Sequence, residues 1–147
     1  CMSDQINISN LIYEYARLID LGDFDGIGEL FERGKIVFRD GEDSTEISGS
    51  INIKELYEKT TRRYDDGTPG THHATTNIAL HIDGDYASAS SYYTVFQQID
   101  GFPLQAIVAG SYEDTFLFEN DEWFFQIREI KVSLVGDISN HLLISLS

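Results

Sequence analysis

Two adjacent histidines, His72 and His73, are the residues in this sequence best suited to acid–base chemistry. An imidazole has an ordinary pKa of about 6.5, so it can accept or donate a proton near neutral pH. They lie in a stretch from Thr71 to Leu80 that follows a glycine-rich turn. Its threonine and isoleucine content and its period of two predict a strand.

Neighbouring side chains on a strand point to opposite faces, so the two histidines cannot enter the same pocket. The alternation places His73, Thr75 and Asn77 on one face. It places His72, Thr76 and Ile78 on the other. A face that carries His, Thr and Asn is too polar for an ordinary core layer. It is therefore either solvated or lines a cavity in which these groups act on a ligand.

The first element needed to position such a site is a helix predicted from about Asp4 to Leu21. Apolar side chains recur there at helical spacing and form one stripe, made of Ile8, Leu11, Ile12, Tyr15, Ala16 and Ile19. Gly22 ends this helix, and Asp23 is expected to cap a second helix that includes Phe24 and Phe31.

Asp20 lies beside the apolar stripe, on the flank next to Ala16. A carboxylate in the last turn of a helix faces the negative end of the helix dipole. Another group is therefore expected to hold Asp20 in place.

The remaining elements follow from alternation and turn signals. A short strand at 35–39 pairs with 45–48, and a third helix follows, capped by Ser50 or Asn52. The strand from 71 to 82 is then followed by three more, at 86–99, 104–118 and 122–135. Helices first and strands afterwards predict an α+β domain spanning residues 1–147, with three N-terminal helices packed on a curved, mainly antiparallel sheet. Such a cone-shaped α+β barrel offers a ligand pocket at its mouth.

Composition excludes several classes of function. Against 10 Lys and Arg stand 25 Asp and Glu, a net charge of −15, which disfavours nucleic acids and anionic membrane surfaces. No apolar run approaches the ~18 residues needed to cross a bilayer, and no signal peptide is visible. The one cysteine, Cys1, precedes Met2, and we interpret it as a cloning remnant. Without a disulfide, a reducing, cytoplasmic location is expected.

The sequence predicts no metal or cofactor site. The histidines lack metal-ligand spacing, and no glycine-rich nucleotide motif or serine nucleophile elbow occurs. His81 and His141 have no partner pattern and are interpreted as structural.

The whole layout resembles the SnoaL-like (polyketide cyclase-like) branch of the nuclear transport factor 2-like superfamily. The resemblance covers nearly the whole chain and rests on a few short segments: Tyr15-Ala16-Arg17-Leu18-Ile19-Asp20-Leu21-Gly22-Asp23, His72-His73-Ala74-Thr75-Thr76-Asn77, Gly110-Ser111-Tyr112-Glu113-Asp114 and Trp123-Phe124-Phe125-Gln126-Ile127-Arg128, with Gly136-Asp137-Ile138-Ser139 near the end.

Within this branch the pattern is similar to that of lyases such as hexachlorocyclohexane dehydrochlorinase and bile-acid 7α-dehydratase. The resemblance implies that His73 is a general base and that Asp20 orients it. It also implies that Arg128 and Tyr15 belong to the pocket. The expected activity is a cofactor-independent lyase or isomerase acting on a small apolar, cyclic molecule, in a protein that dimerises through its sheet.

A purely structural role remains an alternative for Arg128 and for Tyr15. Arg128 could pair with one of the many carboxylates, and Tyr15 could be a core residue of its helix. Two alternatives remain for the function as well: a non-catalytic ligand-binding or oligomerisation module, and the small subunit of a ring-hydroxylating dioxygenase.

Overall fold

A computed structural model describes residues 1–144 and confirms the first helix. Helix α1 spans Met2–Leu21 and buries the apolar stripe, including Ile8, Ile12 and Tyr15. It ends at Gly22, whose φ of 73° lies in the left-handed region that favours glycine. A Cβ at Gly22 would also stand 2.0 Å from the carbonyl oxygen of Gly67, so the close approach of that loop requires glycine as well.

Two shorter helices complete the helical layer. Helix α2 spans Phe24–Leu30 and is capped by Asp23, whose side chain accepts a hydrogen bond from the Gly26 amide at 2.8 Å. Helix α3 spans Ser50–Thr60, and its N-cap is Gly49, so the predicted cap at Ser50 or Asn52 is wrong. The side-chain amide of Asn52 instead donates a hydrogen bond to the backbone carbonyl of Ser48.

Six strands form one sheet in the order β2-β1-β6-β5-β4-β3. The strands are β1 (Lys35–Asp40), β2 (Asp43–Ser48), β3 (Thr71–Asp83), β4 (Tyr86–Ile99), β5 (Phe102–Glu119) and β6 (Glu122–Val135). All neighbours are antiparallel except β1 and β6, which pair in parallel. The sheet is open, because β2 and β3 at its two edges do not pair with each other. The predicted helices on a curved sheet are thus confirmed, without closure into a barrel.

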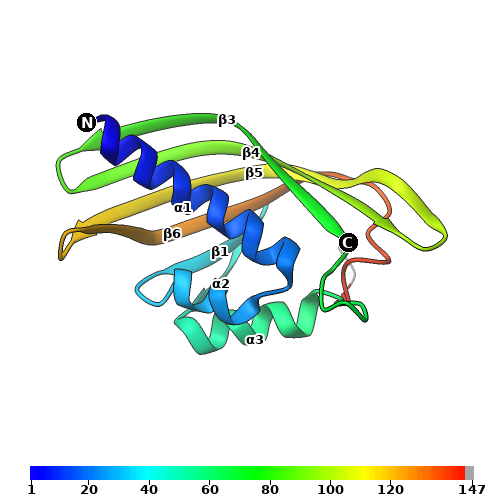
Figure 1. The fold of residues 1–147 in the computed structure, drawn as a ribbon. Coiled ribbons are helices and arrows are strands. Elements are labelled where there is room, and N and C mark those ends of the chain that lie inside the picture. The colour runs from blue at the N-terminus through cyan, green and yellow to red at the C-terminus, as the bar shows by residue number, and fades with distance from the viewer. Residues whose placement is uncertain (145–147) are drawn as a thin grey trace.

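The helices cover one face of the curved sheet (Figure 1), with α1 running diagonally across it and α2 and α3 lying at one end. The apolar core lies between these two layers. It includes Ile12 from α1, Ile53 from α3 and Phe116 from β5, all fully buried. The helices therefore cover the concave side of the sheet and bury the core against it.

Strand β3 departs from the predicted alternation at one position. Asn77 adopts a φ of 56°, and the pairing with β4 shifts between Thr76 and Ala79, which is a β-bulge. As a result Asn77 is exposed and does not share the face of His73, whereas Ile78 packs against the core. The prediction that Asn77 lies with His73, and Ile78 with His72, is wrong because the bulge adds one residue.

The segment after β6 returns to the loop that follows α3 (Figure 1). Leu142 forms a β-bridge with Thr61, and the Arg62 amide donates to the carbonyl of His141 at 2.8 Å. Gln97 of β4 also donates from its side chain to the carbonyl of Asn140 at 3.1 Å. These contacts hold the C-terminal segment against the loop after α3 and against β4.

Candidate active site

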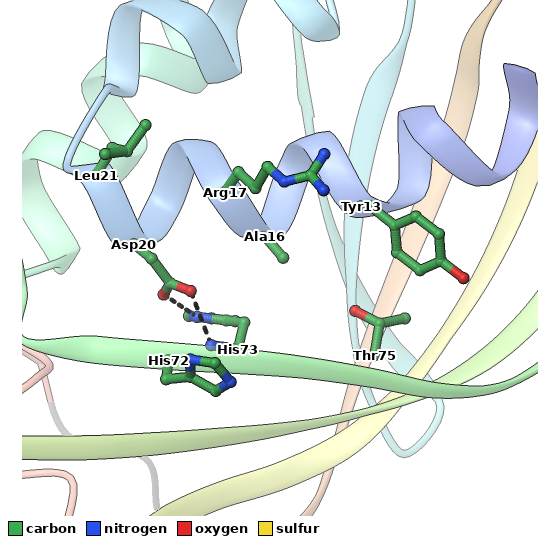
Figure 2. A pocket seen from close by; sticks show the side chains of 8 residues that line it. All are labelled: Tyr13, Ala16, Arg17, Asp20, Leu21, His72, His73 and Thr75. Atoms are coloured by element: carbon green, nitrogen blue, oxygen red, sulfur yellow. Dashed lines mark hydrogen bonds and ion pairs between the residues drawn. The ribbon is translucent and has the colours of Figure 1, made fainter.

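The structure brings His73 and Asp20 into direct contact. The Nδ1 atom of His73 lies 2.6 Å from Oδ1 of Asp20, and the His73 backbone amide donates to Oδ2 at 2.8 Å. The Thr71 hydroxyl donates to Oδ1, also at 2.8 Å. Figure 2 shows Asp20 projecting from the end of α1 toward His73 on β3. One helix and one strand therefore fix the carboxylate and the imidazole together.

These hydrogen bonds from Thr71 and His73 hold the Asp20 carboxylate in place at the C-terminal end of α1, where the helix dipole disfavours it. Burial opposes the ionisation of Asp20, but the hydrogen bonds from the His73 side chain and amide and from Thr71 hold its pKa below the ordinary value. Asp20 is consequently ionised at neutral pH. It is then an acceptor for a proton carried on Nδ1 of His73.

His73 lies between two hollows. One, the outer groove, has a volume of about 540 Å³ and is formed by α1 and the start of β3, with Tyr13, Arg17, Asp20 and His72 in its wall (Figure 2). The other, the inner cavity, has a volume of about 350 Å³ and lies between the helices and the sheet. Asp20 lines the outer groove and not the inner cavity, whereas His73 lines both. The imidazole side chain is only 6% exposed, against 23% for Asp20. Because His72 also lines the outer groove, the prediction that the two histidines cannot enter the same pocket is wrong. Strand β3 is at the edge of the sheet, so side chains from both of its faces can border this groove.

The surface of the inner cavity is mainly apolar, with polar groups set into it. Apolar side chains from the helices, the sheet and the C-terminal segment form most of its wall: Ile19, Phe38, Ile47, Leu56, Val95, Val108, Ile130, Val132, Leu142 and Ile144. The polar lining consists of tyrosines, threonines and histidines: Tyr15, Tyr57, Tyr93, Tyr112, Thr45, Thr60, Thr61, His73 and His141. This balance is typical of a site for a small, largely apolar molecule.

Tyr15 lines this cavity although it belongs to the apolar stripe of α1. Its hydroxyl forms a short hydrogen bond with that of Tyr57 on α3. Burial raises the pKa of Tyr15 and raises that of Tyr57 well above the ordinary value. Both phenols are therefore protonated at neutral pH. One hydroxyl donates to the other, which leaves the proton of the second hydroxyl for donation to a ligand.

Arg128 does not line either hollow. It is fully buried and forms two parallel hydrogen bonds with Asp114, from Nε to Oδ1 and from Nη2 to Oδ2, each 2.8 Å long. Burial opposes its charge, but the Asp114 carboxylate holds the pKa of Arg128 above the ordinary value. The guanidinium stacks on Tyr112 at 3.8 Å and on Tyr15 at 4.5 Å from the ring centroids. Of the two roles considered for Arg128, a pocket residue or a partner of a carboxylate, the structure shows the pair with a carboxylate. The guanidinium contacts the rings of two tyrosines that line the cavity.

The other histidines separate into two groups. His72 is exposed and packs beside Phe96, and His81 is exposed on the far part of β3. His141, in contrast, is buried and lines the inner cavity, with its ring centroid 6.4 Å from that of His73. His141, interpreted from the sequence as structural, is thus placed by the fold in the wall of the inner cavity.

Among the polar cavity residues that were not predicted from the sequence, His141 and Tyr57 lie close to the predicted ones, His73 and Tyr15. His141 lies in a segment without regular structure, so no periodicity indicated where its side chain points. Tyr57 is a buried residue of α3, on the face that packs into the core. The tyrosine type itself could have indicated Tyr57 as a cavity residue. A tyrosine on the buried side of a helix brings a hydroxyl group into the apolar interior, where it needs a polar partner.

Residues 2–129 match the family model of the SnoaL-like domain, so the chain belongs to the SnoaL-like family. A comparison with curated proteins gives no match. No helix among residues 1–144 combines the length and apolar character needed to cross a membrane.

Solved structures agree with this assignment of the fold. An NTF2-like protein with a cystatin-like fold from Novosphingobium aromaticivorans is 23% identical, with a TM-score of 0.72 over 95% of this chain and 87% of that chain. A candidate scytalone dehydratase from the same organism is 19% identical, with a TM-score of 0.72 over 92% and 88%. The beta subunit of a candidate aromatic-ring-hydroxylating dioxygenase, again from that organism, is 16% identical, with a TM-score of 0.70 over 91% and 92%. At these identities the similarity establishes the fold, while function must be argued from the site.

Proposed function

We propose that this protein is a cofactor-independent lyase or isomerase in which His73 removes a proton from a small, apolar, cyclic substrate bound in the inner cavity. The observation that carries the proposal is the position of one imidazole. It lies in the wall of an apolar cavity, and its Nδ1 atom is hydrogen-bonded to a partly buried carboxylate, Asp20. The similarity of the fold to a candidate scytalone dehydratase supports the same class of reaction.

The hydrogen bond to Asp20 selects the tautomer that the chemistry needs. With its proton on Nδ1 donated to Asp20, His73 carries a free lone pair on Nε2 that can accept a proton from a carbon acid. The imidazolium that then forms is stabilised by the adjacent carboxylate. General base catalysis of this kind contributes ~10²–10⁴-fold to a rate.

Tyr15 and Tyr57 supply the complementary acid. Their hydroxyls remain protonated at neutral pH and lie in the wall of the same cavity. In an elimination one of them would donate to the departing group, and in an isomerisation it would stabilise the oxygen of an enolate. Arg128 acts through the rings of Tyr15 and Tyr112 as a positioning residue, because its positive charge favours the developing negative charge on a phenol oxygen.

The cavity limits the substrate class. A volume of about 350 Å³ is at the small end of the range for ligand sites, and the surface of the cavity is mainly apolar. A one- or two-ring compound with one or two oxygen substituents fits this description. The net charge of −15 further disfavours an anionic substrate.

Proton abstraction can be tested without knowing the natural substrate. We expect the protein to catalyse exchange of the α-protons of 2-tetralone with deuterium in D₂O, measured by proton NMR. His73→Gln should lower the enzymatic exchange rate at least ~100-fold. His81→Gln, an exposed histidine on the same strand, is the matched control and should stay within twofold of the parent. A His73→Gln variant within threefold of the parent would rule out His73 as the base.

A thermal-shift screen of cyclic alcohols and ketones would then identify the substrate class, because a ligand that binds only the native state raises the melting temperature. We expect stabilising compounds to lose their effect when the cavity is filled by Val95→Phe, a substitution in the cavity wall.

A second candidate is a subunit or oligomerisation function of the outer sheet face. It is favoured by the exposed apolar side chains Tyr92 (58% exposed) and Leu104 (66% exposed) and by the similar fold of a dioxygenase beta subunit. We propose that this face joins two copies of the chain. Sedimentation should then show a dimer that Tyr92→Lys together with Leu104→Lys converts into a monomer. A parent protein that sediments as a monomer would contradict it.

A further inference from the structure

Within residues 1–144, the buried imidazole of His141 has a polar atom without a hydrogen-bond partner. His141 is 6% exposed, and its Nδ1 atom is buried without a hydrogen-bond partner among residues 1–144. It lines the inner cavity together with His73, and the two rings meet edge to face at an interplanar angle of 67°. A buried polar atom without a partner destabilises the protein unless a ligand or water supplies one.

The backbone of the C-terminal segment places this ring. The His141 amide donates to the carbonyl of Ile138 at 3.1 Å, and its carbonyl accepts from the Arg62 amide at 2.8 Å. One residue before, the Asn140 carbonyl accepts from Gln97, and two residues after, the Leu143 amide donates to the carbonyl of Thr60. Since the backbone on both sides is held, the orientation of the ring toward the cavity is determined by the fold.

The charge state of His141 also differs from that of an ordinary surface histidine. Burial and, to a smaller extent, the neighbouring His73 lower its pKa to about 4, against the opposing effect of Asp20. His141 is therefore neutral at pH 7. A neutral imidazole has one N–H donor and one acceptor, and it does not repel an imidazolium that forms on His73.

We propose that His141 binds an oxygen substituent of the substrate, a ketone or hydroxyl oxygen, in the inner cavity beside His73. The substrate is then an apolar ring whose oxygen contacts His141 while the neighbouring C–H faces His73. This inference rests on the proposed function for the identity of His73 as the base. The binding step itself does not require catalysis.

The two roles fit one substrate geometry. The ring centroids are 6.4 Å apart, and each imidazole reaches a partner over a hydrogen-bond distance of about 3 Å. Adjacent positions of one six-membered ring can therefore contact both imidazoles. For a ketone, the hydrogen bond from His141 would withdraw charge from the carbonyl and acidify the α-proton that His73 removes.

The test compares two probes with the same skeleton, 2-tetralone and tetralin, which differ by the ketone oxygen. Dissociation constants are measured by ligand-observed NMR titration at pH 7. We expect the parent protein to bind 2-tetralone at least tenfold more tightly than tetralin. His141→Phe should reduce this ratio to below twofold and leave the affinity for tetralin within threefold. His141→Gln, which retains a hydrogen-bonding side chain, should recover at least a threefold preference.

A second readout uses the unaltered chain, so that it does not depend on a variant folding. In protein labelled with ¹⁵N-histidine, addition of 2-tetralone should shift an imidazole nitrogen of His141, while tetralin should not. His72, which is exposed, serves as the internal control and should remain unchanged.

The outcomes separate the two proposals. His73→Gln should abolish deuterium exchange while keeping the preference for 2-tetralone, so loss of exchange alone bears on the base and not on His141. A parent protein that binds both probes equally or binds neither, or a His141→Phe variant that keeps the tenfold preference, would overturn the assignment of His141.

Discussion

Replacing His141 with glutamine should remove a specific part of the pH dependence of folding. The pKa of His141 is lowered to about 4 in the folded protein, because the ring is buried and lies beside His73. In the unfolded chain it returns to about 6.5. Between these values the unfolded state binds the additional proton. The stability that comes from a neutral His141 is therefore present at pH 7 and is lost as the pH falls.

The expected magnitude follows from the two pKa values. Between pH 7 and pH 5 the unfolded state gains about 2 kcal/mol from protonation of this one residue, while the folded state gains almost nothing. For a chain of this size that corresponds to a fall of about 4–8 °C in melting temperature. Glutamine does not titrate, so His141→Gln should lack this contribution.

The measurement is urea denaturation followed by circular dichroism at pH 7, 6 and 5, on the parent, on His141→Gln and on His81→Gln as an exposed control. The difference in unfolding free energy between the parent and His141→Gln should change by about 2 kcal/mol across this range. The difference for the control should not change. Because the comparison is made between variants, repulsion among the many carboxylates cancels. A parent-to-His141→Gln difference that stays constant within about 0.5 kcal/mol would refute the argument that the fold keeps this ring neutral.

Three further substitutions test other parts of the structure. Asp114→Ala leaves Arg128 buried without its counter-ion and should lower the unfolding free energy by about 3–5 kcal/mol in urea denaturation; a loss below about 1 kcal/mol would contradict a desolvated pair. Gly110→Ala would place a Cβ 1.9 Å from the carbonyl oxygen of Lys131 and should cost about 1–3 kcal/mol; unchanged stability would contradict that close approach. The pKa of Asp20 lies below its ordinary value, so its contribution to stability is present above pH ~4 and is lost as the pH falls through its folded pKa. Asp20→Asn should therefore weaken the acid dependence of unfolding below pH ~4, and an unchanged acid limb would contradict the contact with His73.

The fold was largely predictable because its elements have strong local signals. The apolar stripe of α1, the glycine at its end and the cap at Asp23 all specify the same helix boundaries, and the structure confirms them. Strands β4 and β6 likewise begin and end at the predicted residues. The parallel pairing of β1 with β6 was not predicted. Register between segments about 90 residues apart depends on tertiary packing, which leaves no periodic pattern in either strand.

The site was predictable only where an element of regular structure carries the residue. His73 and Asp20 lie on a predicted strand and a predicted helix, and the structure brings them together, although their catalytic roles stay a prediction. His141 could not be placed, because the segment after β6 is held by backbone hydrogen bonds to the loop after α3. The position of Arg128 was also undetermined, since the chain contains 25 acidic residues and its partner could have been any of several.

The bulge at Asn77 explains how a single strand serves both the site and the core. Before it, the inward side chains of β3 are Thr71, His73 and Thr75; after it, the partly buried residues that pack on the core are Ile78, Leu80 and Ile82. An unbroken alternation from His73 would instead turn those isoleucines and leucine outward. Asn tolerates the left-handed conformation better than other non-glycine residues, which is why the extra residue fits there. In the sequence, the polar residues of the site occupy odd-numbered positions of β3 and the apolar residues that follow occupy even-numbered positions. The bulge at Asn77 shifts the alternation by one residue, so that both sets of side chains point inward.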